Sequence, residues 1–179
     1  MQATRRAVTA SEASAAGLAA KQLLVSNPLF QTSQHIACYF SQNDEFDCES
    51  IIHEIWRVGK ICYLPVLSGN YLEFAVYLSD QPLRLNRYHI LEPESGEKFA
   101  AKKLDLVIVP LVAFDLRGHR VGMGGGYYDR TFAFRRQRAT DKPFLLGLGY
   151  ELQKVDAVPD NPWDVVLDGV LTEEDLFIL

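Results

Sequence analysis

The stretch LDLVIVPLVAF, residues 104–114, is nearly continuous in apolar side chains. A run of this kind is typical of a strand that is buried on both faces, as in the middle of a parallel sheet covered by helices. We therefore predict that this stretch is the central strand of an α/β domain. The segments on either side of it indicate how the domain is built and where its ligand site lies.

A strand–helix–strand unit precedes the central strand. The runs at 35–40 and 60–66 are apolar and β-prone, and a helix between them is expected to begin at Asp47 or Glu49. One face of this helix is apolar and consists of Ile51, Ile52, Ile55 and Trp56. The opposite face is polar and consists of His53, Glu54 and Arg57. Strands joined through a helix pair in parallel, so the unit predicts a three-layer α/β fold with a mainly parallel or mixed central sheet.

Capping and turn residues mark the remaining elements. Thr9, followed three residues later by Glu12, predicts a capped helix that runs through about Val25 and ends before Pro28. Residues 71–77 alternate in period two and predict a hairpin strand. The other expected elements are a loop at 92–96, a helix at 127–138, and strands at 144–149 and 165–171.

The composition is that of an ordinary globular protein, with 48% hydrophobic and 23% charged residues. No internal repeat or linker appears, so we expect residues 1–179 to form a single domain, and we expect a monomer. The net charge of -5 argues against a nucleic-acid partner, because binding a phosphate backbone normally needs a basic surplus. No run approaches the roughly 18 apolar residues of a membrane span, and no signal-peptide core is present, so a cytoplasmic location is expected.

The segment RVGMGGGYYDR, residues 120–130, follows the central strand and has four glycines in five positions. Glycine permits positive φ and lets a ligand approach the backbone without a Cβ in the way. Consecutive N–H groups can then form a nest for phosphate oxygens, and the helix expected after the loop would add its N-terminal dipole. Arg120 and Arg130 could supply charged donors. Because open α/β sheets bind ligands at strand carboxyl ends, this position favours phosphate binding over a flexible hairpin end or a tight helix–strand contact.

Two carboxylates near this loop are candidate metal ligands. The loop is neither a P-loop, because no Lys-Ser/Thr follows the glycines, nor the dinucleotide fingerprint, whose third glycine would fall at Tyr127. Asp129 and Asp164 are candidates for Mg²⁺, which prefers one or two carboxylates together with phosphate oxygens. The alternative role of Asp129 is to complement the helix dipole.

Aromatic and acidic side chains complete the candidate site. Tyr127 and Tyr128 could stack on a flat heterocycle or form hydrogen bonds, although a buried aromatic pair is an equally common role. Glu45 follows the first predicted strand and is expected on the ligand side of the sheet, with an ordinary polar turn as the alternative. The histidines show no metal-ligand spacing.

The block from Asp115 to Arg130, with GHRVGMGGGYYDR at its core, resembles the signature of the 5-formyltetrahydrofolate cyclo-ligase (methenyltetrahydrofolate synthetase) family. Supporting stretches at 40–45, 59–65 and 158–168 extend the resemblance over nearly the whole chain. It implies a fold similar to the sugar-phosphate isomerase and CoA-transferase group. It also implies a ligase that uses ATP and Mg²⁺ to convert 5-formyltetrahydrofolate, with or without a polyglutamate tail, to 5,10-methenyltetrahydrofolate.

The resemblance further implies a mechanism and a set of site residues. The γ-phosphate activates the formyl oxygen, N10 attacks the activated carbon, and phosphate leaves as the ring closes. Phosphoryl transfer depends on positioning and charge neutralisation more than on protein nucleophiles, in line with the lack of a nucleophile–base pair in the sequence. The implied ATP contacts are Arg120, Val121, Gly122, Met123, Gly124, Gly125, Gly126, Tyr127 and Tyr128. The implied folate contacts are Phe40, Glu45, Met123, Gly124, Gly125, Gly126 and Tyr127. Asp129 and Asp164 would bind Mg²⁺, and Arg120 and Tyr128 would be catalytic.

Two departures from the family pattern change the expected ATP contacts. Some relatives carry basic residues inside the glycine loop where this chain has Met123 and Gly125, so phosphate binding is expected to rely on backbone N–H groups and Arg120. Many relatives also carry an N-terminal Lys-x-x-x-Arg segment that contacts ATP, and this segment is not seen here. Either the sequence starts too late to include it, or Arg5 and Arg6 substitute for it imperfectly. The competing interpretations are a folate- or nucleotide-binding module without turnover, and a sugar-phosphate or CoA-ester enzyme of similar fold.

Overall fold

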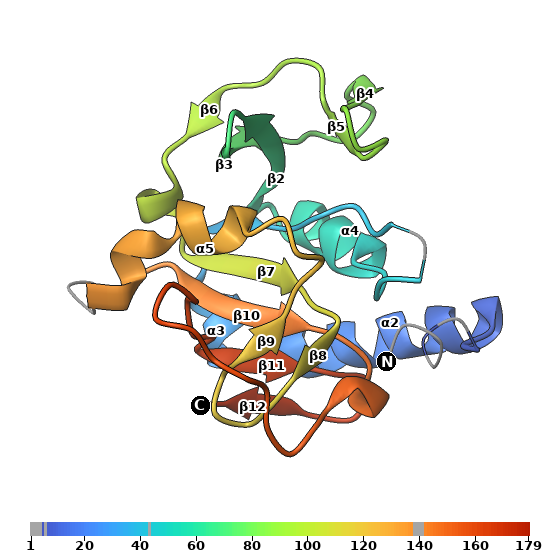
Figure 1. Ribbon diagram of the computed structural model, residues 1–179. Coiled ribbons are helices and arrows are strands. Elements are labelled where there is room, and N and C mark those ends of the chain that lie inside the picture. Colours follow the sequence, from blue (N-terminus) through green and yellow to red (C-terminus); the bar gives the residue numbers. More distant parts are fainter. Residues whose placement is uncertain (1–4, 6, 43, 138–141) are drawn as a thin grey trace.

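The computed structural model describes residues 5, 7–42, 44–137 and 142–179 (Figure 1). Its centre is an eight-stranded sheet in the order β12-β11-β10-β7-β1-β2-β3-β6. The strands from β11 to β2 run parallel, whereas β12, β3 and β6 pair in antiparallel fashion at the two edges. The bounds of the sheet strands are β1 His35–Ala37, β2 Ile61–Ser68, β3 Tyr71–Val76, β6 Lys98–Phe99, β7 Leu106–Pro110, β10 Phe144–Leu148, β11 Gly169–Leu171 and β12 Leu176–Ile178.

The predicted central strand is confirmed. Strand β7 lies between β10 and β1, and its side chains alternate between two apolar cores. Leu106 and Ile108 join the core on one face, whereas Val107 and Val109 join the core on the other. Burial on both faces is the reason why the stretch is continuously apolar instead of alternating.

Helices cover both faces of the sheet, which confirms the three-layer α/β fold (Figure 1). On one face lie α2 Ala10–Ser26, α3 Pro28–Thr32 and α4 Glu49–Arg57. On the other face lie α5 Tyr127–Thr131 and the 3₁₀ turn η2 Ala133–Gln137. Two further 3₁₀ turns are η1 Ala101–Lys103 and η3 Glu151–Gln153. The predicted capping box is present at the start of α2, where Thr9 and Glu12 exchange hydrogen bonds.

Two small hairpins stand outside the main sheet. Strands β8 Ala113–Phe114 and β9 Arg120–Val121 form the first, which separates the central strand from the glycine loop. Strands β4 Leu83–Leu85 and β5 Leu91–Pro93 form the second. The prediction of a plain loop at 92–96 is therefore wrong for its first residues, because Glu92 and Pro93 belong to a strand and are buried.

Three other local predictions differ from the structure. The strand predicted at 165–171 is a strand only over Gly169–Leu171. The helix predicted at 127–138 is shorter, because a five-residue α-helix gives way to a 3₁₀ turn; position 138 lies outside the described residues. The Thr131 hydroxyl at the end of this helix accepts a hydrogen bond from the Leu72 N–H (2.8 Å), which ties the helix end to strand β3. Glu54, predicted on the polar face of α4, is buried, and both of its carboxylate oxygens accept hydrogen bonds from Arg57 at 2.7 Å.

Candidate active site

A cavity of about 1130 Å³ opens at the carboxyl ends of the central strands. Tyr39 and Phe40, just after β1, and Pro110, at the end of β7, all line it. From β1 the chain continues to β2 on one side, and from β7 it continues to β10 on the other. The cavity therefore lies at the point where the strand order reverses, which is the usual ligand position in open α/β sheets.

The residues that the family resemblance implies for ATP, folate and Mg²⁺ at positions 40, 45, 120–129 and 164 all line this one cavity. We divide these lining residues by their chemistry. The set that we call the charged wall consists of Arg120, Gly122, Gly124, Gly125, Asp129 and Asp164. The set that we call the aromatic wall consists of Tyr39, Phe40, Glu45, Tyr71, Tyr88 and Ile90. The structure thus brings residues from distant parts of the chain to one cavity. Which ligand each of them binds stays a prediction.

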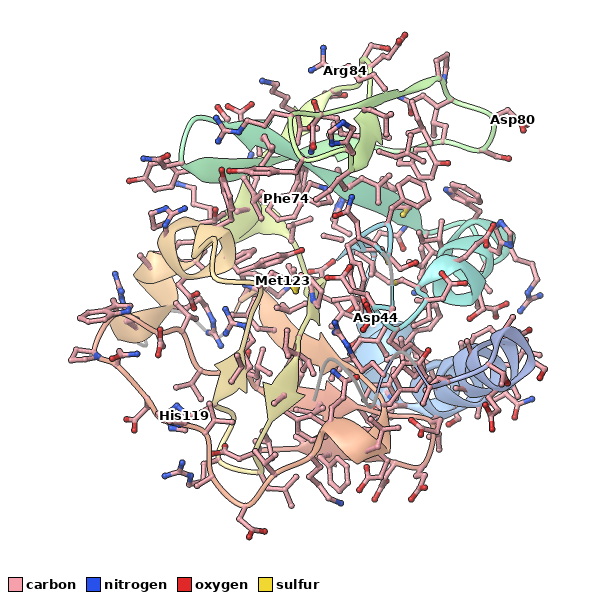
Figure 2. The ribbon with its side chains drawn as sticks, turned by 45° about the vertical axis from the view of Figure 1, so that its right-hand side comes forward. Asp44, Phe74, Asp80, Arg84, His119 and Met123 are labelled. Carbon is pink, nitrogen blue, oxygen red and sulfur yellow. The ribbon has the colours of Figure 1, made fainter. Side chains whose placement is uncertain are left out.

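The glycine loop is open toward solvent. Residues 122–125 are exposed, and Figure 2 shows Met123 near the middle of this face of the molecule. A Cβ placed on Gly122 or Gly124 would meet no atom within 4 Å, and Gly124 has a left-handed φ of 84°. Within the part of the chain that the structure describes, no hydrogen bond uses the amide N–H groups of residues 123–126. The loop thus presents unused backbone donors to the cavity, as an anion nest requires.

Helix α5 contributes less to this loop than the sequence suggested. A helix of five residues carries only a small macrodipole, so its dipole contribution at the loop is smaller than the sequence led us to expect. Arg130 is also largely engaged: its Nη2 donates to the Gly125 carbonyl (2.6 Å) and its Nε to the Asn70 carbonyl (2.7 Å). Arg130 therefore lines the cavity and also ties the loop to the β2–β3 turn.

Arg120 and Asp129 form an ion pair in the charged wall. The Arg120 Nη2 lies 2.7 Å from Asp129 Oδ1, and the Arg120 side chain is only 7% exposed. The same Oδ1 accepts a hydrogen bond from the Val165 N–H (3.1 Å), and the Val165 carbonyl accepts one from Arg120. These contacts fasten the glycine loop to the segment that carries Asp164.

Each of the two carboxylates uses one oxygen in such contacts. Both hydrogen bonds to Asp164 reach its Oδ2, from the Asn161 N–H (2.9 Å) and from the Asn161 side-chain amide (3.2 Å). In the described part of the chain, Asp129 Oδ2 and Asp164 Oδ1 take part in no hydrogen bond. Among the described residues, no group of three or more His, Cys, Asp or Glu side chains is placed to hold a metal ion.

The pKa values of Tyr128 and Glu45 are both raised in this cavity. Burial, followed by the nearby Glu45 carboxylate, raises the pKa of the Tyr128 phenol far above its usual value, so the hydroxyl stays protonated. Burial also raises the pKa of Glu45, although the hydrogen bond from the Gln42 N–H (2.9 Å) opposes this effect. Tyr128 is therefore a hydrogen-bond donor at the border between the two walls.

Tyr127 faces the opposite way, toward the β4–β5 hairpin. Its hydroxyl lies 3.0 Å from the Tyr88 hydroxyl and accepts a hydrogen bond from Arg87 Nη2 (2.5 Å). These two hydrogen bonds lower the pKa of the Tyr127 phenol. The Arg130 guanidinium lies over the Tyr127 ring at 5.0 Å from its centroid. The two adjacent tyrosines thus join different parts of the cavity and are not a buried aromatic pair.

Arg5 does not line the cavity. Its side chain is 2% exposed, its Nε donates to Asp44 Oδ2 (3.1 Å), and its Nη1 donates to the Leu111 carbonyl (3.2 Å). Arg5 therefore anchors the loop that precedes Glu45. It is not in the position of direct contact with ATP that the sequence offered for it. Arg6 lies outside the described residues.

Several cavity residues were not anticipated from the sequence. The hairpin β4–β5 contributes Asn86, Tyr88, Ile90 and Leu91. Trp163, which is 62% exposed, also lines the cavity, and its carbonyl accepts a hydrogen bond from Arg136 Nη1 (2.6 Å). Exposed aromatic side chains near a glycine loop would indicate ligand-binding residues. The sequence alone, however, does not indicate which aromatic residues stay exposed.

A mainly parallel sheet with helices on both faces, and with a cavity at its switch point, defines an α/β protein. Unused backbone donors and two carboxylates in that cavity are typical of the α/β proteins that bind phosphorylated ligands. No described helix has both the length and the apolar character needed to cross a membrane.

Within that class the chain belongs to the 5-formyltetrahydrofolate cyclo-ligase family, whose model matches residues 1–173. It is 40% identical over 145 residues to the 5-formyltetrahydrofolate cyclo-ligase of Haemophilus influenzae, covering 78% of this chain and 75% of the relative. It is 36% identical over 174 residues to the enzyme of that name from Escherichia coli K12, covering 94% and 93%. The solved structure of Aquifex aeolicus 5,10-methenyltetrahydrofolate synthetase matches with a TM-score of 0.85 at 30% identity, covering 98% of this chain and 87% of that one.

Proposed function

We propose that this protein catalyses the ATP- and Mg²⁺-dependent cyclisation of 5-formyltetrahydrofolate to 5,10-methenyltetrahydrofolate, with release of ADP and phosphate. The observation that carries the proposal is that the predicted site residues at positions 40, 45, 120–129 and 164 all line one cavity of about 1130 Å³. The names of the family relatives supply the substrate class. The two unlike walls of the cavity suit two unlike ligands.

The charged wall suits the triphosphate of ATP. The unused N–H groups of the glycine loop are donors for phosphate oxygens, and their exposure allows the backbone to be approached closely. Arg120 adds a fixed positive charge, because its ion pair with Asp129 holds the guanidinium in place before any ligand binds. In our proposal Arg120 stabilises the negative charge on the phosphoryl group during its transfer to the formyl oxygen.

Asp129 and Asp164 fit a magnesium site. Each carboxylate is oriented through one oxygen and has its other oxygen available, and both line the cavity. Two carboxylates with phosphate oxygens and waters are the usual ligands of Mg²⁺ at a nucleotide, so no third protein ligand is needed. Bound there, Mg²⁺ would neutralise part of the negative charge of the phosphates.

The aromatic wall suits the folate. Flat side chains such as Phe40 and Tyr88 offer apolar area to the pterin, and Glu45, which also lines the cavity, would accept hydrogen bonds from its polar edge. Tyr128, which stays protonated, would donate a hydrogen bond near the formyl group and orient it toward the phosphates. The residues of this wall would thus bind and orient the substrate, while those of the charged wall neutralise charge.

The complete candidate site comes from one chain. Because a single copy supplies both walls, we further propose that residues 1–179 act as one domain and as a monomer. Sedimentation analysis at the concentration of the activity assay tests this point, and an active dimer without active monomer would contradict it.

The test is to incubate the purified protein with 5-formyltetrahydrofolate, ATP and Mg²⁺ and to follow the absorbance of the methenyl product. We expect product only when all three are present, with one ADP formed per product, and we expect a chelator to stop the reaction. Folate binding without product would support a binding module instead. Absence of binding to either ligand would overturn the proposal.

A further inference from the structure

The tip of the β4–β5 hairpin, residues 86–90, borders the cavity without a large apolar core to hold it. Asn86, Tyr88 and Ile90 line the cavity, yet Leu85 and Leu91 on the adjoining strands are 59% and 40% exposed. A two-stranded hairpin has little stability of its own. Its position over the cavity therefore depends on polar contacts.

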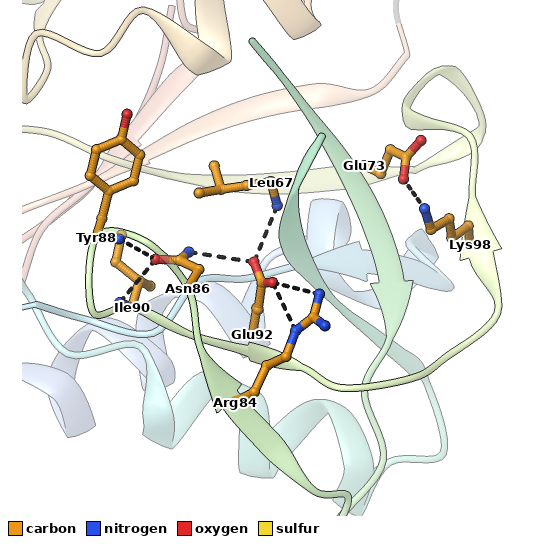
Figure 3. A network of polar contacts seen from close by, with 8 residues as sticks. All are labelled: Leu67, Glu73, Arg84, Asn86, Tyr88, Ile90, Glu92 and Lys98. Atoms are coloured by element: carbon orange, nitrogen blue, oxygen red, sulfur yellow. Dashed lines mark hydrogen bonds and ion pairs between the residues drawn. The ribbon is translucent and has the colours of Figure 1, made fainter. Parts of the chain in front are cut away.

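Glu92 joins this hairpin to the sheet through hydrogen bonds (Figure 3). The side chain is buried, and its Oε2 accepts a hydrogen bond from the Leu67 N–H of strand β2 at 3.2 Å. Its Oε1 accepts from Arg84 Nε (3.1 Å) and Arg84 Nη2 (3.0 Å) on the neighbouring hairpin strand. A buried carboxylate is costly unless it is fully paired, so these contacts fix how the hairpin meets the sheet.

Asn86 extends this contact to the tip (Figure 3). Its amide Nδ2 lies 3.4 Å from Glu92 Oε2, while its Oδ1 accepts hydrogen bonds from the N–H groups of Tyr88 (2.9 Å) and Ile90 (3.2 Å). The tip contains a non-glycine residue, His89, with a φ of 59°, a conformation that needs such support. Asn86 thus sets the shape of the turn that carries two cavity residues.

The tip is joined to the folate side of the proposed site. Gln42 Nε2 donates to the carbonyl of His89 (2.9 Å), and the Gln42 N–H donates to the Glu45 carboxylate (2.9 Å). The carboxylates proposed for Mg²⁺ are held by other segments, through Val165 and Asn161. The tip also contacts Tyr127, through the Tyr88 hydroxyl (3.0 Å) and Arg87 Nη2 (2.5 Å). A displaced tip would therefore alter the aromatic wall and Tyr127, while Arg120, Asp129 and Asp164 keep their own contacts.

We propose that Glu92 and Asn86 are positioning residues that hold the hairpin tip so that Tyr88 and Ile90 contact the folate. This inference rests on the proposed function, because it names the ligand that the tip would touch. Neither residue contacts the reacting atoms in this scheme. Both act through the shape of the turn.

The first test compares Glu92→Ala and Asn86→Ala with a matched control, Glu73→Ala. Glu73 forms an exposed ion pair with Lys98 that lies outside the cavity lining (Figure 3). We expect the KM for 5-formyltetrahydrofolate to rise about tenfold in both hairpin variants, with the KM for MgATP within about twofold of wild type. The control should match wild type. Equal rises in both KM values, or no rise, would overturn the inference.

The conservative variant Glu92→Gln separates positioning from general destabilisation. Glutamine keeps one acceptor oxygen but places a donor amide against another donor, so it should restore part of the lost folate affinity. If Glu92→Ala does not fold, Asn86→Ala retains the buried carboxylate and still tests the tip. An Asn86→Ala protein with an unchanged KM for the folate would then count against the proposal.

Hydrogen exchange in the absence of ligands tests the positioning step independently of the reaction. The amides of Tyr88 and Ile90 should exchange faster in Glu92→Ala and Asn86→Ala, and should be unchanged in Glu73→Ala. Unchanged exchange at these amides in the first two variants would refute the positioning role even if the wild-type protein is active. An inactive wild-type protein with the expected exchange would instead point to a failure of the proposed function.

Discussion

The two walls of the cavity differ in how far their polar groups are paired before a ligand arrives. In the charged wall Arg120 is 7% exposed and already paired with Asp129, and the loop backbone is open. In the aromatic wall large side chains remain uncovered, with Tyr71 at 56% and Tyr88 at 49% exposure. One wall presents fixed charges and dipoles, and the other presents apolar area that a ligand can bury.

This difference indicates how one cavity can treat two ligands separately. Fixed charges cost little reorganisation when a phosphoryl group is transferred, so the charged wall should act on ATP and Mg²⁺. Uncovered aromatic area gains free energy when a flat ligand removes it from water, so the aromatic wall should act on the folate. Substitutions in the two walls should then change different kinetic constants.

The largest effect is expected for Asp129→Asn in the charged wall. Asparagine keeps an oxygen that can accept the hydrogen bonds of Val165 and Arg120, but it removes the charge proposed to bind Mg²⁺. We expect turnover to fall by about a hundredfold or more, with the melting temperature nearly unchanged. Steady-state rates over a Mg²⁺ titration measure this. Asp160→Asn, an exposed acid outside the cavity lining, is the control and should match wild type. Wild-type rates for Asp129→Asn would remove this residue from the metal site.

The next effect concerns the support beneath the charged wall. Asp115 is fully buried in the β8–β9 turn and accepts hydrogen bonds from the Arg117 guanidinium (2.7 Å) and from the N–H groups of His119 (3.1 Å) and Val158 (2.9 Å). Burial alone would raise the pKa of Asp115, but these hydrogen bonds outweigh it and lower the pKa from 3.8 to about 2. The folded state therefore favours the ionised form.

Asp115→Asn should cost about 2 kcal/mol of folding free energy at neutral pH, a value that follows from the size of this shift. Because the pKa is lower in the folded state, the stabilisation is complete above about pH 4 and is lost as the pH falls toward about 2. Urea unfolding at several pH values measures the difference between wild type and variant. A difference that persists unchanged at pH 2, or that is absent at pH 7, would contradict this account.

The features that could be predicted from sequence are those with a local pattern. The continuous apolar run at 106–110 identifies a strand that is buried on both faces, and Thr9 with Glu12 identifies a helix start. Gly122 and Gly124 indicate an open backbone because glycine itself leaves that backbone uncovered. In each case the cause of the structure lies within a few neighbouring residues.

The features that could not be predicted depend on partners far away in the chain. Glu92 is buried because Leu67 and Arg84 pair with it, and nothing near Glu92 in sequence indicates this. Arg120 could be assigned to a phosphate, but its pairing with Asp129 and the Val165 backbone requires that the loop and the later segment meet. The hairpin strands are only three residues long, and one buried position is the charged Glu92, so they lack the apolar periodicity that reveals a strand.

A smaller effect on the charged wall is expected for Gly122→Ala. Gly122 has no left-handed φ, and a Cβ there would meet no protein atom within 4 Å, so folding should be unaffected. The added methyl group would occupy space needed by the phosphates, and the KM for MgATP should rise about tenfold. Gly17→Ala in helix α2 is the control, because its Cβ meets only ordinary contacts and Gly17 is not among the residues that line the cavity. An unchanged KM for MgATP in Gly122→Ala would show that ATP does not approach the loop at this point.

The smallest effect is expected for Glu45→Gln in the aromatic wall. Glutamine keeps one acceptor oxygen, so losing the charge should raise the KM for the folate only about fivefold and leave the KM for MgATP unchanged. Burial raises the pKa of Glu45 above its usual value of 4.5, so the carboxylate gains its proton at a higher pH than an exposed glutamate does. As the pH falls through that pKa, the wild-type KM for the folate should rise toward that of Glu45→Gln, whose own KM should not follow this titration. Parallel pH profiles for the two proteins would mean that Glu45 does not bind the folate. The aromatic wall would then have no acidic residue that contacts the folate, and the proposed assignment of one ligand to each wall would be weakened.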